Sequence, residues 1–419
     1  MQKPVVVVGA GLAGLVCARR LEQSGRDVLV LESSDAVGGR MRTDLVDGFR
    51  LDRGFQVFFE AYPNARLELD FGKLNLKDFE PGCLVFDGKK MREVHRENLI
   101  ETLFSNWVPI ADLMRMHQLG DELDDLTESQ VWHLDDVSMI DFLKVRKFTD
   151  KTIDRFFRPF FGGVFLDRDL NVSSRLFAFV WQMLDRAPAT VPAMGMQAIP
   201  DQIAEGIKPE SFRFGARVES LIRKDSRIAG VRLESGEEID AEMVIVATDQ
   251  ASCARLTGVG TPQESKGCTT VHFAATEKPV FESILMVNGS AIGMVNHVAC
   301  MTNASKDLAP SGQVLISATL LDSPSMPDME LAKSVRYELR DWFPDQMVES
   351  WRPLRVDRIS HAQLVQSEGF MDRLTPTQPE AGLIIAGDHT AYAGIDGAVV
   401  SGQHAAAVIL SAEREPVGA

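Results

Sequence analysis

The chain has 419 residues, of which 45% are apolar and 25% are charged, and its formal net charge is −16. This length and composition are those of a globular protein with a sizeable core and two domains. The acidic balance argues against nucleic acid as a partner and against a generally anionic membrane surface.

The first element is a strand, glycine turn, helix and strand. An apolar run at 4–8 precedes the glycines, and a second run at 28–31 leads into Glu32. Gly9 permits the tight turn, Gly11 lets the backbone approach a pyrophosphate, and Gly14 lets the helix lie close to the strand. The helix N-terminus offers N–H groups to phosphate, and Glu32 can accept from a ribose 2′-OH. The unit predicts a dinucleotide site made by Gly9, Gly11, Leu12, Ala13, Gly14, Glu32 and Ser33.

A second glycine motif, Gly38-Gly39-Arg40, follows shortly after Glu32. Two adjacent glycines let the chain pass close to an extended dinucleotide, and a guanidinium can neutralise its diphosphate. A nicotinamide dehydrogenase does not need this extra contact, whereas a bulky flavin dinucleotide does. The motif therefore favours FAD as the cofactor.

With these motifs the chain resembles the flavin amine oxidase superfamily, which includes monoamine and polyamine oxidases, protoporphyrinogen oxidases and phytoene-desaturase-like enzymes. The matching residues are 9–14, Glu32, 38–40 and the C-terminal pair Gly387-Asp388. The resemblance implies an α/β fold, in which a Rossmann-like FAD-binding domain carries an inserted α+β substrate domain. We expect a discontinuous FAD-binding domain at 1–75, 205–260 and 375–419, and a substrate domain at 76–204 and 261–374.

The segment at 41–60 contains a hairpin turn signal at Asp47-Gly48. In the superfamily, an Asp-x-Gly sequence at this place brings backbone beside the flavin ring system. The resemblance therefore implies that Gly54 and Phe55 contact the cofactor. Gln56 is a catalytic and cofactor-binding candidate that would face the flavin edge or the substrate, or else it is a surface loop residue.

Two apolar segments follow in the inserted region. Residues 99–119 have apolar side chains at helical spacing, which suits either a membrane dock or an ordinary core-facing stripe. The acidic run at 121–125 favours at most a peripheral membrane contact. Residues 156–165 are unusually aromatic, and they either line a large apolar substrate pocket or pack between helices.

The chain then returns to strand character. Alternation and apolar runs predict strands at 217–221, 228–233 and 243–246, and the resemblance places Val218 near the adenine. Further strands are expected at 269–275, 313–320 and 355–359, with a helix at 332–342.

Many amine oxidases of the superfamily carry a lysine on the strand before Lys278-Pro279, where it holds a water at flavin N5. The matching position here is Val271 or its neighbour His272, and this departure weighs against monoamine-oxidase-type chemistry. His272 is a candidate for proton transfer, because an imidazole titrates near neutral pH. A core or loop-bonded histidine is the alternative.

The C-terminal region carries a buried strand at 383–386, then Gly387-Asp388, and then a glycine- and alanine-rich helix. The resemblance implies that Asp388 bonds ribityl or pyrophosphate groups. The helix that starts near Gly397 and Ala398 would aim its positive end at flavin N1 and O2.

The five cysteines are scattered, odd in number and without a Cys-x-x-Cys pair, which predicts buried thiols in a reducing compartment and no metal site. No cysteine follows Cys300, whereas covalent family members attach flavin through a C-terminal cysteine, so we expect non-covalent FAD. We also expect no signal peptide and no spanning helix, and therefore a cytoplasmic protein.

These observations predict an FAD-dependent oxidoreductase that oxidises or desaturates a small to medium, apolar organic substrate. Hydride would pass to flavin N5, and O₂ or a quinone-like acceptor would reoxidise the flavin. The alternatives are an amine oxidase and a flavin-dependent isomerase without net redox turnover. An amine substrate predicts a small pocket flanked by aromatic side chains, for which Tyr392 is the tyrosine in the flavin-closing segment.

Overall fold

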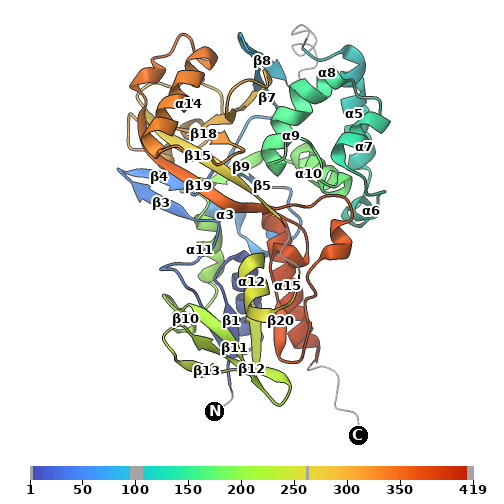
Figure 1. Cartoon of the computed structure of the whole chain (residues 1–419), viewed down its shortest axis with the longest axis vertical. Coiled ribbons are helices and arrows are strands. Elements are labelled where there is room, and N and C mark those ends of the chain that lie inside the picture. Colours follow the sequence, from blue (N-terminus) through green and yellow to red (C-terminus); the bar gives the residue numbers. More distant parts are fainter. Residues whose placement is uncertain (1–2, 95–106, 261–263, 413–419) are drawn as a thin grey trace.

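The computed structural model describes residues 3–94, 107–260 and 264–412, and the chain forms two lobes. The lower lobe in Figure 1 is built on a five-stranded parallel sheet, in the order β10-β2-β1-β14-β20. Its strands come from widely separated parts of the sequence: β1 (Val5–Val8), β2 (Val28–Leu31), β10 (Phe212–Arg213), β14 (Met243–Val246) and β20 (Leu383–Ile385).

Both faces of this sheet are covered, which explains the continuous apolar runs of its strands. Helices α1 (Leu12–Gln23) and α15 (Ile395–Ala412) pack together over one face. Their contact is close, since a Cβ added at Gly402 would lie 2.4 Å from the carbonyl oxygen of Ala13. The other face packs on a three-stranded antiparallel sheet formed by β11 (Val218–Lys224), β12 (Arg227–Leu233) and β13 (Glu238–Asp240). Helix α12 (Gln250–Thr257) lies beside this second sheet.

The upper lobe contains a seven-stranded sheet in the order β19-β15-β18-β17-β16-β7-β8. All neighbours are antiparallel except β16 and β7. Helix α14 (Asp328–Trp342) buries its apolar stripe on one face of the sheet (Figure 1). The strands are β7 (Cys83–Phe86), β8 (Met91–Val94), β15 (Ser265–Ala275), β16 (Leu285–Asn288), β17 (Val295–Cys300), β18 (Val314–Leu320) and β19 (Arg352–Leu364).

A group of helices stands beside this sheet and completes the upper lobe (Figure 1). The aromatic segment forms one turn of π-helix at Ile153–Phe157 that continues into α9 (Arg158–Phe165), and α9 packs against β17. The other members are α5 (Ile110–Asp124), α6 (Glu128–Trp132), α7 (Met139–Val145), α8 (Asp150–Thr152), α10 (Ser174–Arg186) and the short α13 (Met301–Ala304).

Small elements join the lobes. The hairpin β3 (Thr43–Val46) and β4 (Phe49–Asp52) turns at Asp47 and Gly48, whose φ angles of 52° and 84° suit the predicted tight turn. A three-stranded antiparallel sheet in the order β5-β9-β6 lies nearby. Its strands are β5 (Phe58–Phe59), β6 (Leu76–Asp78) and β9 (Ala189–Pro192). The short helices that adjoin it are α2 (Ala65–Glu68), α3 (Phe71–Leu74) and α11 (Ala198–Ala204).

The α/β fold expected from the sequence is confirmed, as are the strands expected at 228–233, 243–246, 313–320 and 355–359. The domain boundaries stay a prediction. Of the helix expected at 99–119, residues 99–106 lie outside the described residues, and α5 begins only at Ile110. All five cysteines are buried and free. Across the described residues, no helix has both the length and the apolar character that crossing a membrane requires.

Candidate active site

One large cavity of about 1060 Å³ is lined by residues of both lobes. Small-molecule and cofactor pockets measure about 300–1,000 Å³, so this cavity is of the size that a large cofactor requires. Most of the residues predicted to hold the cofactor line it, namely Gly9, Gly11, Leu12, Ala13, Glu32, Ser33, Gly38, Gly39, Arg40, Gly54, Phe55, Gln56, Val218, Gly387, Asp388 and Ala398.

The glycine turn forms an open cradle at one end of the cavity. Gly9 has a φ of 105°, and a Cβ there would lie 2.6 Å from the carbonyl oxygen of Ala247. Gly14 does not line the cavity, and its Cβ would lie 2.1 Å from the carbonyl oxygen of Gly9, so its role is to pack the helix on the turn. A Cβ at Gly11, in contrast, would meet no protein atom within 4 Å. The space over Gly11 is therefore open to a ligand.

The carboxylate of Glu32 lies beside this cradle. One of its oxygens accepts from the backbone N–H of Ala10 at 2.8 Å, and the other accepts from that of Ser34 at 2.8 Å. Two backbone donors thus fix the orientation of the carboxylate just after β2. This is the position from which an acid can bind a ribose hydroxyl in a Rossmann-like fold.

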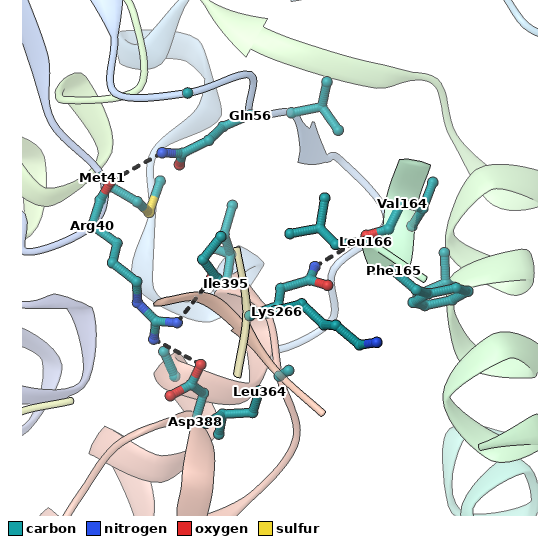
Figure 2. A pocket seen from close by; sticks show the side chains of 18 of the residues that line it. Arg40, Met41, Gln56, Val164, Phe165, Leu166, Lys266, Leu364, Asp388 and Ile395 are labelled. Carbon is teal, nitrogen blue, oxygen red and sulfur yellow. Dashed lines mark hydrogen bonds and ion pairs between the residues drawn. The ribbon is translucent and has the colours of Figure 1, made fainter. Parts of the chain in front are cut away.

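The two ends of the sequence meet at an ion pair in the cavity wall (Figure 2). The Arg40 guanidinium lies 2.7 Å from the Asp388 carboxylate and also donates to the carbonyl oxygen of Ala362 at 3.2 Å. The attraction of Asp388 raises the pKa of Arg40, so the guanidinium stays charged. A fixed cation at this place suits a diphosphate.

Gln56 lies in the cavity wall and not in a remote surface loop (Figure 2). Its amide nitrogen donates to the carbonyl oxygens of Arg40 at 3.0 Å and Arg53 at 3.1 Å. The side chain thereby holds the Gly38-Gly39-Arg40 motif against the segment around Gly54. A catalytic role for Gln56 stays a prediction.

The N-terminal end of α15 forms another part of the wall. Gly394, Ile395 and Ala398 line the cavity, whereas Gly397 packs inward. A Cβ at Gly397 would lie 1.9 Å from the carbonyl oxygen of Tyr392, so only glycine allows this first turn to fold so tightly. The positive end of the helix thus borders the cavity.

The aromatic segment contributes both to the core and to the wall of the cavity. Phe157 is fully buried and packs on Phe177 and Trp181, as core residues do. Phe156 and Phe160 are half-buried and line the cavity. The cavity wall on this side is predominantly apolar, and its further members include Leu113, Met116, Phe161, Val164, Phe165, Leu176, Val180, Trp181 and Leu184.

A small polar group interrupts this apolar wall. The ammonium of Lys266, on β15, lies 3.9 Å from the Asp167 carboxylate, which also accepts from the backbone N–H groups of Asp169 and Asn171. Figure 2 shows Lys266 between Leu364 and the segment at 164–166. The strand therefore carries a cavity-lining lysine, whereas Val271 and His272 do not line the cavity.

Lys266 was missed because the strand was expected to begin at residue 269, whereas β15 begins at Ser265. The pairing of β15 with β19 shifts register between Lys266 and Cys268 and again between His272 and Phe273. The extra residues lie on β19, so side chains still alternate along β15. Strand alternation around Lys266 and Cys268, both of which line the cavity, was the usable signal.

His272 lies outside the cavity lining and is 2% exposed. Its Nδ1 lies 3.0 Å from the Ser317 hydroxyl, and its Nε2 lies 3.1 Å from the Asp357 carboxylate. Arg355 also binds Asp357, and both its guanidinium and this carboxylate face the β3–β4 hairpin. The histidine thus has the bonded, buried environment considered as the alternative, and a proton-transfer role for it stays a prediction.

Two other aromatic groups are informative. Tyr392 is buried in the core, where its hydroxyl donates to Asp396 at 2.7 Å, and it does not line the cavity. His297 lines the cavity beside Phe55, at 4.9 Å between ring centroids, and burial lowers the pKa of His297 to about 4. His297 is therefore a neutral group near pH 7, which the sequence patterns gave no reason to select.

The family model for flavin containing amine oxidoreductases matches residues 12–410. The chain belongs to this family. It is 28% identical over 290 residues to the zeta-carotene-forming phytoene desaturase of Myxococcus xanthus, an alignment that covers 58% of this chain and 53% of the desaturase. The chain thus spans about half the length of that relative. It is also 22% identical over 461 residues to the 15-cis-phytoene desaturase of Capsicum annuum, covering 97% and 77% of the two chains.

Among solved structures, wild-type putrescine oxidase bound to putrescine has the same fold, with a TM-score of 0.73 at 19% identity and coverage of 98% of this chain and 99% of the oxidase. The family consists of flavin-containing oxidoreductases. The open space over Gly11, the fixed Arg40 cation and the volume of the cavity all fit FAD.

Proposed function

We propose that this oxidoreductase oxidises or desaturates a small to medium, apolar organic substrate at a carbon next to the flavin. When bound, FAD supplies a two-electron acceptor that takes hydride at N5. The matching proton leaves the substrate separately, and O₂ or a quinone-like compound is the proposed final acceptor of the two electrons. The protein supplies binding, orientation and exclusion of water.

The glycine cradle and the Arg40 cation support the proposed place of the cofactor. The diphosphate would lie over Gly11 and the N-terminus of α1, with the Glu32 carboxylate on the adenosine ribose and Val218 beside the adenine. The flavin ring would lie between Gly54, Phe55 and the N-terminal end of α15. FAD is proposed to be held without a covalent bond, because no cysteine follows Cys300.

The apolar wall carries the proposal about the substrate. Side chains from α5, α9 and α10 line the cavity beyond the residues assigned to the cofactor. Tyr392 is part of the core and forms no aromatic cage for an amine. An apolar, unsaturated molecule of the polyene, isoprenoid or tetrapyrrole type would bury its surface against this wall.

Lys266 favours a second candidate, which is oxidation of an amine. In many amine oxidases of the family, a lysine on this strand holds a water at flavin N5, and Lys266 lines the cavity on β15. The polar group formed with Asp167 would then lie near the reacting carbon. We rank this candidate second because the surrounding wall is predominantly apolar.

Anaerobic reduction of the bound flavin separates the two candidates. The purified holoenzyme is mixed without O₂ with a polyene isoprenoid in micelles, with a tetrapyrrole, or with putrescine, and the visible flavin absorbance is followed. We expect bleaching with an apolar substrate and none with putrescine. Bleaching by the amine alone would overturn the first proposal.

A pair of variants shows whether the apolar wall binds the substrate. Val164→Trp fills part of the cavity and should slow bleaching without loss of FAD. Val145→Trp places the same side chain at a position that is 77% exposed on α7, and should leave bleaching unchanged. Equal rates for both variants would place the substrate elsewhere.

A further inference from the structure

A fully buried carboxylate lies directly behind the cavity wall at the start of α15. Asp396 is 0% exposed, while its neighbours Gly394, Ile395 and Ala398 line the cavity and Asp396 itself does not. Its position in the first helical turn places a side-chain charge within the positive end of the helix dipole.

Four donors surround this carboxylate. One oxygen accepts from the backbone N–H groups of Asn64 at 3.0 Å and Ala65 at 2.8 Å. The other accepts from the Asn64 amide at 3.0 Å and the Tyr392 hydroxyl at 2.7 Å. Because the backbone and amide N–H groups can only donate, both oxygens of Asp396 act as hydrogen-bond acceptors.

The charge has no cationic partner among the described residues, since no arginine, lysine or histidine there lies within ion-pair distance of Asp396. Its effect reaches other groups nearby. Burial raises the pKa of Glu128 and that of Tyr392, and the negative charge of Asp396 raises both pKa values further. The carboxylate is therefore balanced by four hydrogen-bond donors and the positive end of α15, and not by a cationic side chain.

We propose that Asp396 is a positioning residue that lowers the reduction potential of the bound flavin. The inference rests on the flavin placement proposed above, with N1 and O2 at the N-terminal end of α15. Reduction places negative charge at that edge, and the helix end stabilises it. The Asp396 carboxylate offsets part of that positive end, so added electrons are held less tightly.

Two variants with opposite expected effects test this role. Asp396→Asn removes the negative charge and should raise the midpoint potential of the bound flavin. Tyr392→Phe removes one donor and leaves the charge less neutralised, so it should lower the potential. Asp328→Asn, in the first turn of α14 in the upper lobe, and Tyr337→Phe, at an exposed site, are the matched controls and should not change it.

The potential is measured on the purified holoenzymes by equilibration with a redox dye, after circular dichroism and flavin content have verified folding and occupancy. No substrate is needed, so an error in the proposed substrate leaves this test intact. Absence of any potential change in Asp396→Asn, or a rise in Tyr392→Phe, would overturn the inference. If Asp396→Asn does not fold, the sign of the Tyr392→Phe shift decides alone.

Discussion

Gly11→Ala separates the stability of the fold from the binding of the cofactor. Gly11 has φ −76° and ψ 177°, an ordinary extended conformation for alanine, and the new Cβ would meet no protein atom within 4 Å. Alanine is a poorer N-cap than glycine, by about 0.5–1 kcal/mol. It also restricts the unfolded chain, which stabilises the fold by about 0.4–1 kcal/mol. The two terms offset, so the free energy of unfolding should change by no more than about 0.5 kcal/mol.

The same methyl group occupies the space proposed for the diphosphate. Overpacking a close contact costs about 1–3 kcal/mol, which corresponds to a rise of about 5- to 150-fold in the Kd for FAD. The assay combines urea unfolding of the apo-protein with titration of FAD followed by flavin fluorescence.

Two other glycines serve as comparisons. Gly14→Ala should destabilise the apo-protein strongly, since its Cβ would overlap the carbonyl oxygen of Gly9. Gly72→Ala, in α3 and outside the cavity lining, should leave the Kd for FAD unchanged. Wild-type affinity in Gly11→Ala would refute the placement of the diphosphate over this residue.

Four further outcomes are expected. Glu32→Ala should raise the Kd for FAD by about 10- to 150-fold, from the loss of one charge-assisted bond of about 1.5–3 kcal/mol, and an unchanged Kd would remove Glu32 from the site. Acid-denatured protein should show the polypeptide mass alone by mass spectrometry, and flavin retained on the chain would contradict non-covalent binding. Burial lowers the pKa of His297 from 6.5 to about 4 in the folded protein. Between pH 6.5 and pH 4 the unfolded chain therefore binds more protons at this residue than the folded chain does. The free energy of unfolding should fall by up to about 3 kcal/mol as pH is lowered through that range. His297→Phe should make the urea unfolding profile flatter there, and an unaltered profile would contradict the assignment. Purified protein should not float stably with neutral or anionic liposomes, and stable co-flotation would overturn the expectation of at most peripheral membrane contact.

The parts of the site nearest the sequence ends could be predicted because they depend on local backbone chemistry. The glycines at 9–14 and 38–39 are needed wherever a chain turns tightly or passes close to another atom, and such needs are written directly into the sequence. The motifs at both ends of the chain assigned Arg40 and Asp388 separately to the cofactor, and the structure shows these two side chains 2.7 Å apart.

The middle of the site depends on tertiary register, which spacing alone does not reveal. Lys266 lines the cavity from a part of β15 that precedes the strand expected from residue 269, since β15 begins at Ser265. His272 satisfied a residue-type criterion for proton transfer, yet Ser317 and Asp357, distant in sequence, bind both its ring nitrogens in the interior. No sequence pattern pointed to His297. It lines the cavity because of its place on β17 and its packing against Phe55, which only the folded structure reveals.

A crystal structure of the FAD-bound protein is the most direct test of where the cofactor lies and which wall its flavin ring faces. It should show the diphosphate over Gly11 within reach of the α1 N-terminus, and the flavin ring between Gly54 and the start of α15, with its N5 edge open to the apolar wall at Phe156 and Phe160. A flavin ring lying elsewhere, or one that leaves no space against that wall, would contradict the account.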